Sequence, residues 1–91
     1  MATVTFTVNE LRASDPELAR ELEGEIRLAA SRSRPRFALD CRILVEHDLS
    51  GRPASVRVQF ERPGWVKSFG VSLQQPLSDV RQAADGVLGS R

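Results

Sequence analysis

Arginine is the residue type in this sequence that most clearly suggests binding chemistry. Three arginines, with a serine among them, fall within the five-residue segment Arg32-Ser33-Arg34-Pro35-Arg36. A guanidinium group donates parallel hydrogen bonds to two phosphate oxygens, so such a cluster is typical of sites that hold a phosphate backbone. We therefore predict a nucleic-acid-binding site formed by six arginines: Arg32, Arg34, Arg36, Arg42, Arg52 and Arg57. The alternative is that the first three are charges at a helix C-terminus and on a solvated loop.

Residues suited to catalysis or metal binding are few and isolated. His47 is the only histidine, and a lone histidine at a strand end beside Asp48 is typically solvated. Cys41, the only cysteine, alternates with apolar residues, which favours a buried and unreactive thiol. The sequence contains no CxxC pair, no HExxH motif and no Walker or GxGxxG loop. We therefore predict no enzyme activity, no bound metal and no cofactor.

Two further pairs have both a structural and a functional interpretation. Glu21 and Glu25 are one helical turn apart, a spacing that suits metal or acid–base chemistry in a cleft, but the acidic surroundings favour a solvated face. Trp65 and Phe69 share one strand parity, which predicts that both face the core. A register slip of one residue would instead make them an aromatic platform for a base or a protein partner.

An amphipathic helix is expected in the first third of the chain. Either Asp15 caps it with Pro16 at the first helical position, or Ser14 and Glu17 form a capping box. Pro35 prevents the helix from continuing. Apolar residues recur at three- and four-residue spacing along it, which defines one buried stripe: Leu18, Leu22, Ile26, Ala29 and Ala30.

The remaining elements are four strands and a second helix. Alternation of apolar with polar residues predicts strands over 3–8, 37–46, 55–61 and 65–73. The last strand carries Lys67, which is typical of an edge. A second apolar stripe predicts a helix over 77–88.

These elements predict an α+β fold. The order β-α-β-β-β-α favours a four-stranded mixed sheet in a two-layer sandwich, with the first two strands parallel and both helices on one face. The other face is left for water or a partner. That face is expected to carry Thr3, Thr5, Asp40, Arg42, Arg57, Gln59 and Ser68.

Length and composition indicate a single small domain, residues 1–91. The net charge is +1, but residues 1–25 carry −4 and residues 26–67 carry +5. No apolar stretch is long enough to cross a bilayer, and the N-terminus lacks the pattern of a signal peptide. We therefore expect a cytoplasmic protein with no membrane partner. Nothing in the sequence predicts its oligomeric state.

The last helix and the central hairpin resemble those of the bacterial ribosome hibernation-promoting factors, also called ribosome-associated inhibitors. The likeness lies in Asp79-Val80-Arg81-Gln82-Ala83-Ala84-Asp85, and in the strands Ile43-Leu44-Val45-Glu46-His47-Asp48 and Ala54-Ser55-Val56-Arg57-Val58-Gln59-Phe60. The resemblance implies a β-α-β-β-β-α domain that binds ribosomal RNA at the decoding region and blocks translation. The chain differs in its acidic first helix and in Arg81, where the family has an aromatic residue.

The expected function is that of a non-catalytic regulatory protein that occupies a site on the ribosome or on structured RNA. The alternative is a protein–protein interaction module, such as an assembly, adaptor or phage structural subunit, which uses its acidic helix or a sheet edge. A third interpretation is a small enzyme subunit whose active site is completed by another chain.

Overall fold

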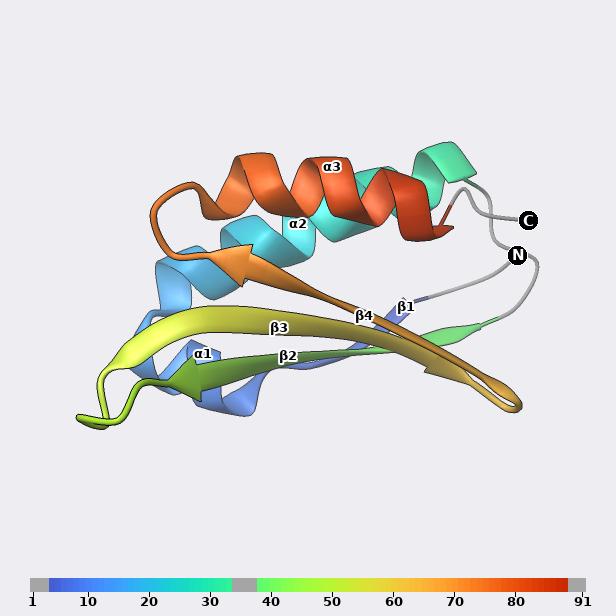
Figure 1. The fold of residues 1–91 in the computed structure, drawn as a ribbon. Coiled ribbons are helices and arrows are strands. Elements are labelled where there is room, and N and C mark those ends of the chain that lie inside the picture. The colour runs from blue at the N-terminus through green and yellow to red at the C-terminus, as the bar shows by residue number, and fades with distance from the viewer. Residues whose placement is uncertain (1–3, 34–37, 89–91) are drawn as a thin grey trace.

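A four-stranded sheet lies beneath two long helices, and a short helix follows the first strand (Figure 1). The computed structural model describes residues 4–33 and 38–88. Its elements, in chain order, are β1 (Val4–Thr7), α1 (Asn9–Ser14), α2 (Pro16–Ser33), β2 (Leu39–His47), β3 (Pro53–Arg62), β4 (Trp65–Ser72) and α3 (Pro76–Leu88). The predicted α+β class, mixed sheet and helical layer are confirmed.

The strands lie in the order β1-β2-β3-β4, so β1 and β4 form the two edges. β1 pairs with β2 in parallel, whereas β2–β3 and β3–β4 are antiparallel. This is the predicted pairing, with β4 at an edge. The turn between β3 and β4 needs Gly64, whose φ of 76° is a left-handed conformation that glycine adopts without strain.

The start of α2 settles which of the two predicted caps is used. The Asp15 Oδ1 atom accepts a hydrogen bond from the main-chain N–H of Leu18 at 3.1 Å, and Pro16 is the first helical residue. A side chain that accepts from the third helical N–H satisfies a donor with no partner inside the helix. The Ser14 hydroxyl instead donates to the carbonyl of Leu11, at 3.3 Å.

The helix α1 was not predicted from the sequence. We expected the first strand to continue through Val8, but that residue immediately precedes α1, and its carbonyl accepts from the N–H of Arg12 at 2.8 Å. Val8 is 1% exposed and Leu11 is 3% exposed, so both join the core. With one buried residue in six, α1 is too short to show helical periodicity. The element order is therefore β-α-α-β-β-β-α.

The core fills the space between the sheet and the helices α2 and α3. Most residues on the apolar faces of the predicted strands and helices are buried: Leu22, Ile26, Leu39, Cys41, Ile43, Val56, Val58, Phe60, Val71, Val80 and Ala84. Four others that were expected to face the core are only half-buried: Leu18, Ala30, Trp65 and Phe69. Phe69 is half-buried because it lies on the edge strand, where its ring packs 6.0 Å from that of Phe60. The predicted register is right, since Arg42 is exposed and Arg57 and Gln59 are half-buried.

Candidate functional site

The sheet face that α2 and α3 leave uncovered is polar. The side chains of paired residues on neighbouring strands point to the same face of the sheet. The strand register therefore shows which side chains lie in one row across this face. One row runs from Arg42 through Gln59 to Ser68, and the next runs from Leu44 through Arg57 to Gly70. The two sheet arginines of the predicted nucleic-acid site therefore do lie on one face.

Carboxylates on the same face neutralise both of those arginines. The Arg57 Nε atom lies 3.3 Å from Glu46 Oε2, and the Arg42 Nε atom lies 3.8 Å from Glu61 Oε1. With Asp40, which pairs with Glu61 in the ladder, three carboxylates face two guanidinium groups over the described part of this face. A phosphate group would have to displace these carboxylates to reach the arginines.

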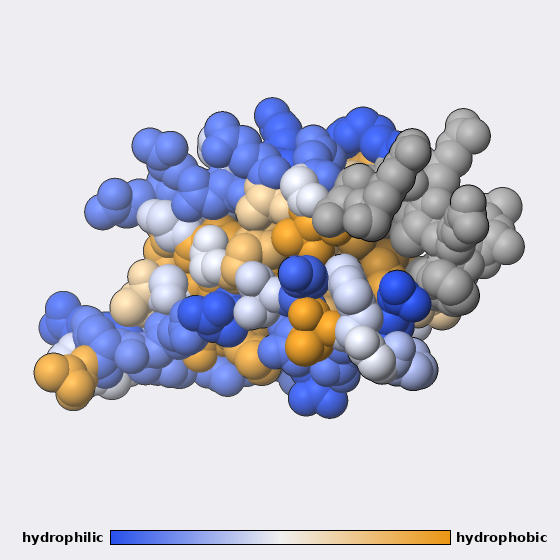
Figure 2. Space-filling model, turned by 45° about the vertical axis from the view of Figure 1, so that its right-hand side comes forward, coloured by the Kyte–Doolittle hydropathy of each residue, from blue (hydrophilic) through white to orange (hydrophobic). Residues whose placement is uncertain are grey.

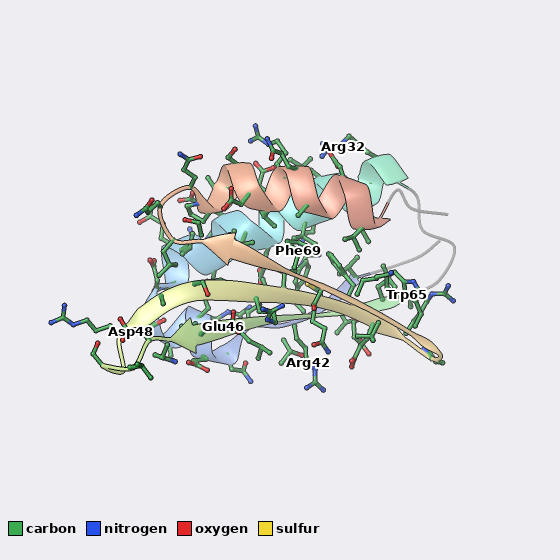
Figure 3. The ribbon with its side chains drawn as sticks, in the orientation of Figure 1. Arg32, Arg42, Glu46, Asp48, Trp65 and Phe69 are labelled. Carbon is green, nitrogen blue, oxygen red and sulfur yellow. The ribbon has the colours of Figure 1, made fainter. Side chains whose placement is uncertain are left out.

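The other predicted site arginines are not gathered with these two. Arg32 lies near the end of α2, and its Nη2 atom is 2.9 Å from Asp85 Oδ1 of α3. Figure 3 shows Arg32 in the helical layer and Arg42 below the sheet, on opposite sides of the molecule. Arg52 lies in the loop between β2 and β3, where its main-chain N–H donates to Asp48 Oδ1 at 3.1 Å. Arg34 and Arg36 lie outside the described residues.

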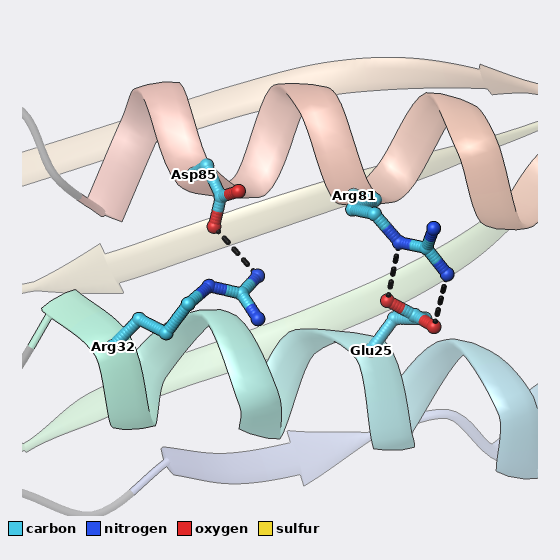
Figure 4. Close-up of polar contacts among 4 residues, drawn as sticks. All are labelled: Glu25, Arg32, Arg81 and Asp85. Atoms are coloured by element: carbon cyan, nitrogen blue, oxygen red, sulfur yellow. Dashed lines mark hydrogen bonds and ion pairs between the residues drawn. The ribbon is translucent and has the colours of Figure 1, made fainter.

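The acidic pair predicted on the first helix is divided between two environments. Glu21 is exposed, as expected of a solvated carboxylate. The side chain of Glu25 is only 16% exposed and accepts two hydrogen bonds from Arg81, at 3.1 and 2.9 Å (Figure 4). The expectation of a solvated face is therefore wrong for Glu25, because α3 brings a guanidinium group against it. These bonds hold the pKa of Glu25 below its usual value.

The lone cysteine and the lone histidine lie in different environments, one buried and the other exposed. Burial raises the pKa of the Cys41 thiol to about 12, which suppresses the reactive thiolate. His47 lies with Nε2 3.5 Å from Glu10 Oε1 at the surface. Among residues 4–33 and 38–88, no three histidine, cysteine, aspartate or glutamate side chains are grouped to hold a metal ion. Within the same ranges, no helix is long and apolar enough to span a membrane.

Asp48 has a local structural role in the loop between β2 and β3. Its Oδ1 atom accepts from the Ser50 hydroxyl at 2.6 Å and from the main-chain N–H groups of Ser50 and Arg52 at 2.9 and 3.1 Å. These hydrogen bonds lower the pKa of Asp48, and the bond from the Ser50 hydroxyl has the largest effect. The carboxylate therefore shapes the loop that presents Arg52.

The strand β4, which was predicted to lie at an edge, has an open side. In an antiparallel pair, alternate residues direct their main-chain groups toward the partner strand and the others direct them away. Ser72 belongs to the outward set, since its N–H donates to Asp79 Oδ2 at 2.9 Å rather than to β3. By the same parity, Val66, Ser68 and Gly70 also face outward, and their main-chain groups have no hydrogen-bond partner among the described residues. We call these three residues the open β4 edge.

An apolar seam runs above the open β4 edge, between α3 and the sheet. Arg81 and Asp85 face α2, and Ala84 faces the core, so Ala83 and Val87 lie on the flank of α3 away from α2. Both residues are half-buried. Phe69 lies on the core-facing side of β4, below α3 in Figure 3. We call Phe69, Ala83 and Val87 the apolar seam. Figure 2 shows apolar surface between the polar helical layer and the polar strands.

Comparison of the chain with protein-family models, with curated proteins and with solved structures gave no match. Its function is therefore inferred from the surfaces described above.

Proposed function

We propose that this chain is a non-catalytic interaction module that binds another protein by adding a strand to the open β4 edge. The observation that carries the proposal is the set of outward main-chain groups on Val66, Ser68 and Gly70, which have no partner among the described residues. A sheet edge of this kind pairs readily with an extended segment, because its free N–H and C=O groups are already spaced as in a β-ladder.

The surroundings of this edge favour a protein ligand. A strand bound there extends the sheet, and its alternate side chains contact the apolar seam of Phe69, Ala83 and Val87. Main-chain hydrogen bonds then supply affinity, and the apolar contacts supply selectivity. β4 carries a single charge, Lys67, and no proline, and its pairing with β3 runs without a bulge, so the common protections of an edge are nearly absent.

The arginine distribution gives weaker support to RNA as the ligand. Arg32, Arg42 and Arg57 each form an ion pair with a carboxylate of this chain. The observation that favours RNA is Arg52, which is exposed in its loop and has no ion pair among the described residues. Binding to ribosomes or structured RNA is therefore the second candidate function, and Arg52 is the residue that we expect to contact the RNA phosphates.

Photo-crosslinking in the native host tests the two candidates side by side. A small diazirine amino acid replaces Ser68 at the edge, Arg52 in the loop, or Glu21 on the exposed face of α2 as a matched control. We expect adducts from position 68 that are destroyed by protease and insensitive to nuclease, with none from position 21. Nuclease-sensitive adducts from position 52, with none from position 68, would replace the protein-binding proposal by the RNA-binding one.

A further inference from the structure

The open β4 edge is arranged symmetrically about its central residue. Ser68 has one outward-facing neighbour on each side, Val66 and Gly70, and the outward group of Ser72 is already bonded to Asp79. A two-fold axis through Ser68 therefore places the edge against the same edge of another molecule. Each outward N–H group then faces a carbonyl group of the other molecule. In an antiparallel ladder, two residues in a hydrogen-bonded pair each donate one N–H···O bond to the other.

We propose that the strand bound at this edge is β4 of a second copy of this chain, in antiparallel register centred on Ser68. The inference rests on the proposed function and names its partner. In this register Ser68 lies opposite Ser68 of the second copy, and Val66 lies opposite Gly70 of the second copy. The two four-stranded sheets become one continuous eight-stranded sheet, and the interface is isologous, as in most homodimers.

The side chains on the uncovered face fit this register. Val66 is one of the exposed large apolar residues of the described chain, with 58% of its surface accessible. Gly70 has open space where a side chain would be, since a Cβ built there meets no atom within 4 Å. In the dimer, Val66 of each copy lies across from Gly70 of the other copy. The backbone of the glycine therefore covers the exposed valine at two symmetry-related places.

The side chains on the helical face also fit, and they do so by charge. Residues 67 and 69 of the two copies are opposite one another in this register, so Lys67 meets Phe69 rather than another lysine. An ammonium group over an aromatic ring is attracted to it, whereas like charges directly opposite would repel. On α3, Ala83 and Gly86 are small, so the flanks of two symmetry-related helices can approach above the new strand pair.

Charge substitutions at the axis test the inference on the purified full chain by sedimentation equilibrium. Ser68→Lys and Ser68→Glu each place like charges opposite themselves, and Ser68 is exposed, so neither change disturbs the core. We expect a wild-type dimer, a dimer dissociation constant raised at least about ten-fold in either variant, and recovery in their equimolar mixture. Thr5→Lys and Thr5→Glu, at an exposed position of the edge strand β1, are matched controls that should dimerise like the wild type.

Two outcomes would overturn the second copy as partner. One is a wild type that stays monomeric up to about millimolar concentration, the range in which weak associations are populated. The other is a dimer that is equally stable in both Ser68 variants. If heterologous proteins are still crosslinked at position 68 in either case, strand addition stands and only the identity of the partner is wrong. If position 68 gives no adduct at all, the proposed function fails with it.

Discussion

Arg81 of α3 donates two hydrogen bonds to Glu25 of α2, from Nε to Oε2 at 3.1 Å and from Nη2 to Oε1 at 2.9 Å. The two residues are 56 positions apart in sequence. Seven residues further along α2 and four residues further along α3, Arg32 and Asp85 form a second bridge between these helices (Figure 4). Both bridges join the side of α3 that faces α2, so the opposite flank of α3 is the one that lies toward the apolar seam.

The Arg81–Glu25 pair makes stability depend on acid pH. Because the folded-state pKa of Glu25 lies below its usual value of 4.5, its contribution is present above about that pH and is lost as the pH falls through the folded-state pKa. We expect Arg81→Ala to lower the urea midpoint at pH 7, and the difference from wild type to shrink by pH 3. Arg20→Ala, an exposed change on α2, is the control. If Arg81→Ala lowered the urea midpoint by the same amount at pH 7 and pH 3, the loss of the ion pair would not be the cause.

Cys41 should be inert to thiol reagents while the chain is folded. With its pKa raised to about 12 by burial, only about one thiol in ten thousand is ionised at pH 8. We expect labelling by an aromatic disulfide to be slow in buffer and rapid in denaturing urea. Rapid labelling in buffer, with the circular dichroism spectrum unchanged, would contradict the burial of this residue.

Phe60 and Phe69 touch one another yet should differ in their contribution to folding. Phe60 is fully buried, so Phe60→Ala should lower the free energy of unfolding by about 3–5 kcal/mol. Phe69 is half-buried on the edge strand, so Phe69→Ala should cost roughly half as much. Urea unfolding curves measure both. Equal losses of unfolding free energy in the two variants would show that Phe69 belongs to a closed core and not to an accessible apolar seam.

A salt titration measures how far the arginines bind RNA. Each phosphate contact changes the slope of log affinity against log salt by roughly −0.7 to −0.9. On the protein-binding proposal, affinity for ribosomes or structured RNA should be weak at low salt and little changed when Arg32, Arg34 and Arg36 are replaced by alanine. Tight binding whose slope flattens by about two to three units in that triple variant would establish RNA as the ligand instead.

Much of the fold follows from local patterns in the sequence. Asp15 and Pro16 predict where α2 begins, and the parity of Ile43, Val58 and Phe60 predicts which side of the sheet is buried. The helix α1 escapes prediction because six residues with one buried side chain do not establish a period. Bridges such as Arg32–Asp85, between residues 53 positions apart, depend on packing that no local pattern records.

For the candidate site, too, local patterns predict which face a residue lies on but not which residues lie beside it. Strand alternation predicts that Arg42 and Arg57 share a face, and they do. It does not reveal that Glu61 and Glu46 lie beside them, since these ion pairs are set by the register between β2 and β3. The edge position of β4 was predicted from Lys67, but the free groups of Ser68 and its neighbours emerge only once the ladder is known.

Amide hydrogen exchange along β4 tests the central claim most directly. In the free monomer, the outward amides of Val66, Ser68 and Gly70 should exchange quickly, whereas those of Lys67 and Phe69, bonded to β3, should exchange slowly. When the edge is occupied, in the dimer or in a complex purified from the host, the three outward amides should slow by at least about ten-fold and the inward ones should change little. Outward amides that remain fast in the complex would contradict strand addition at β4.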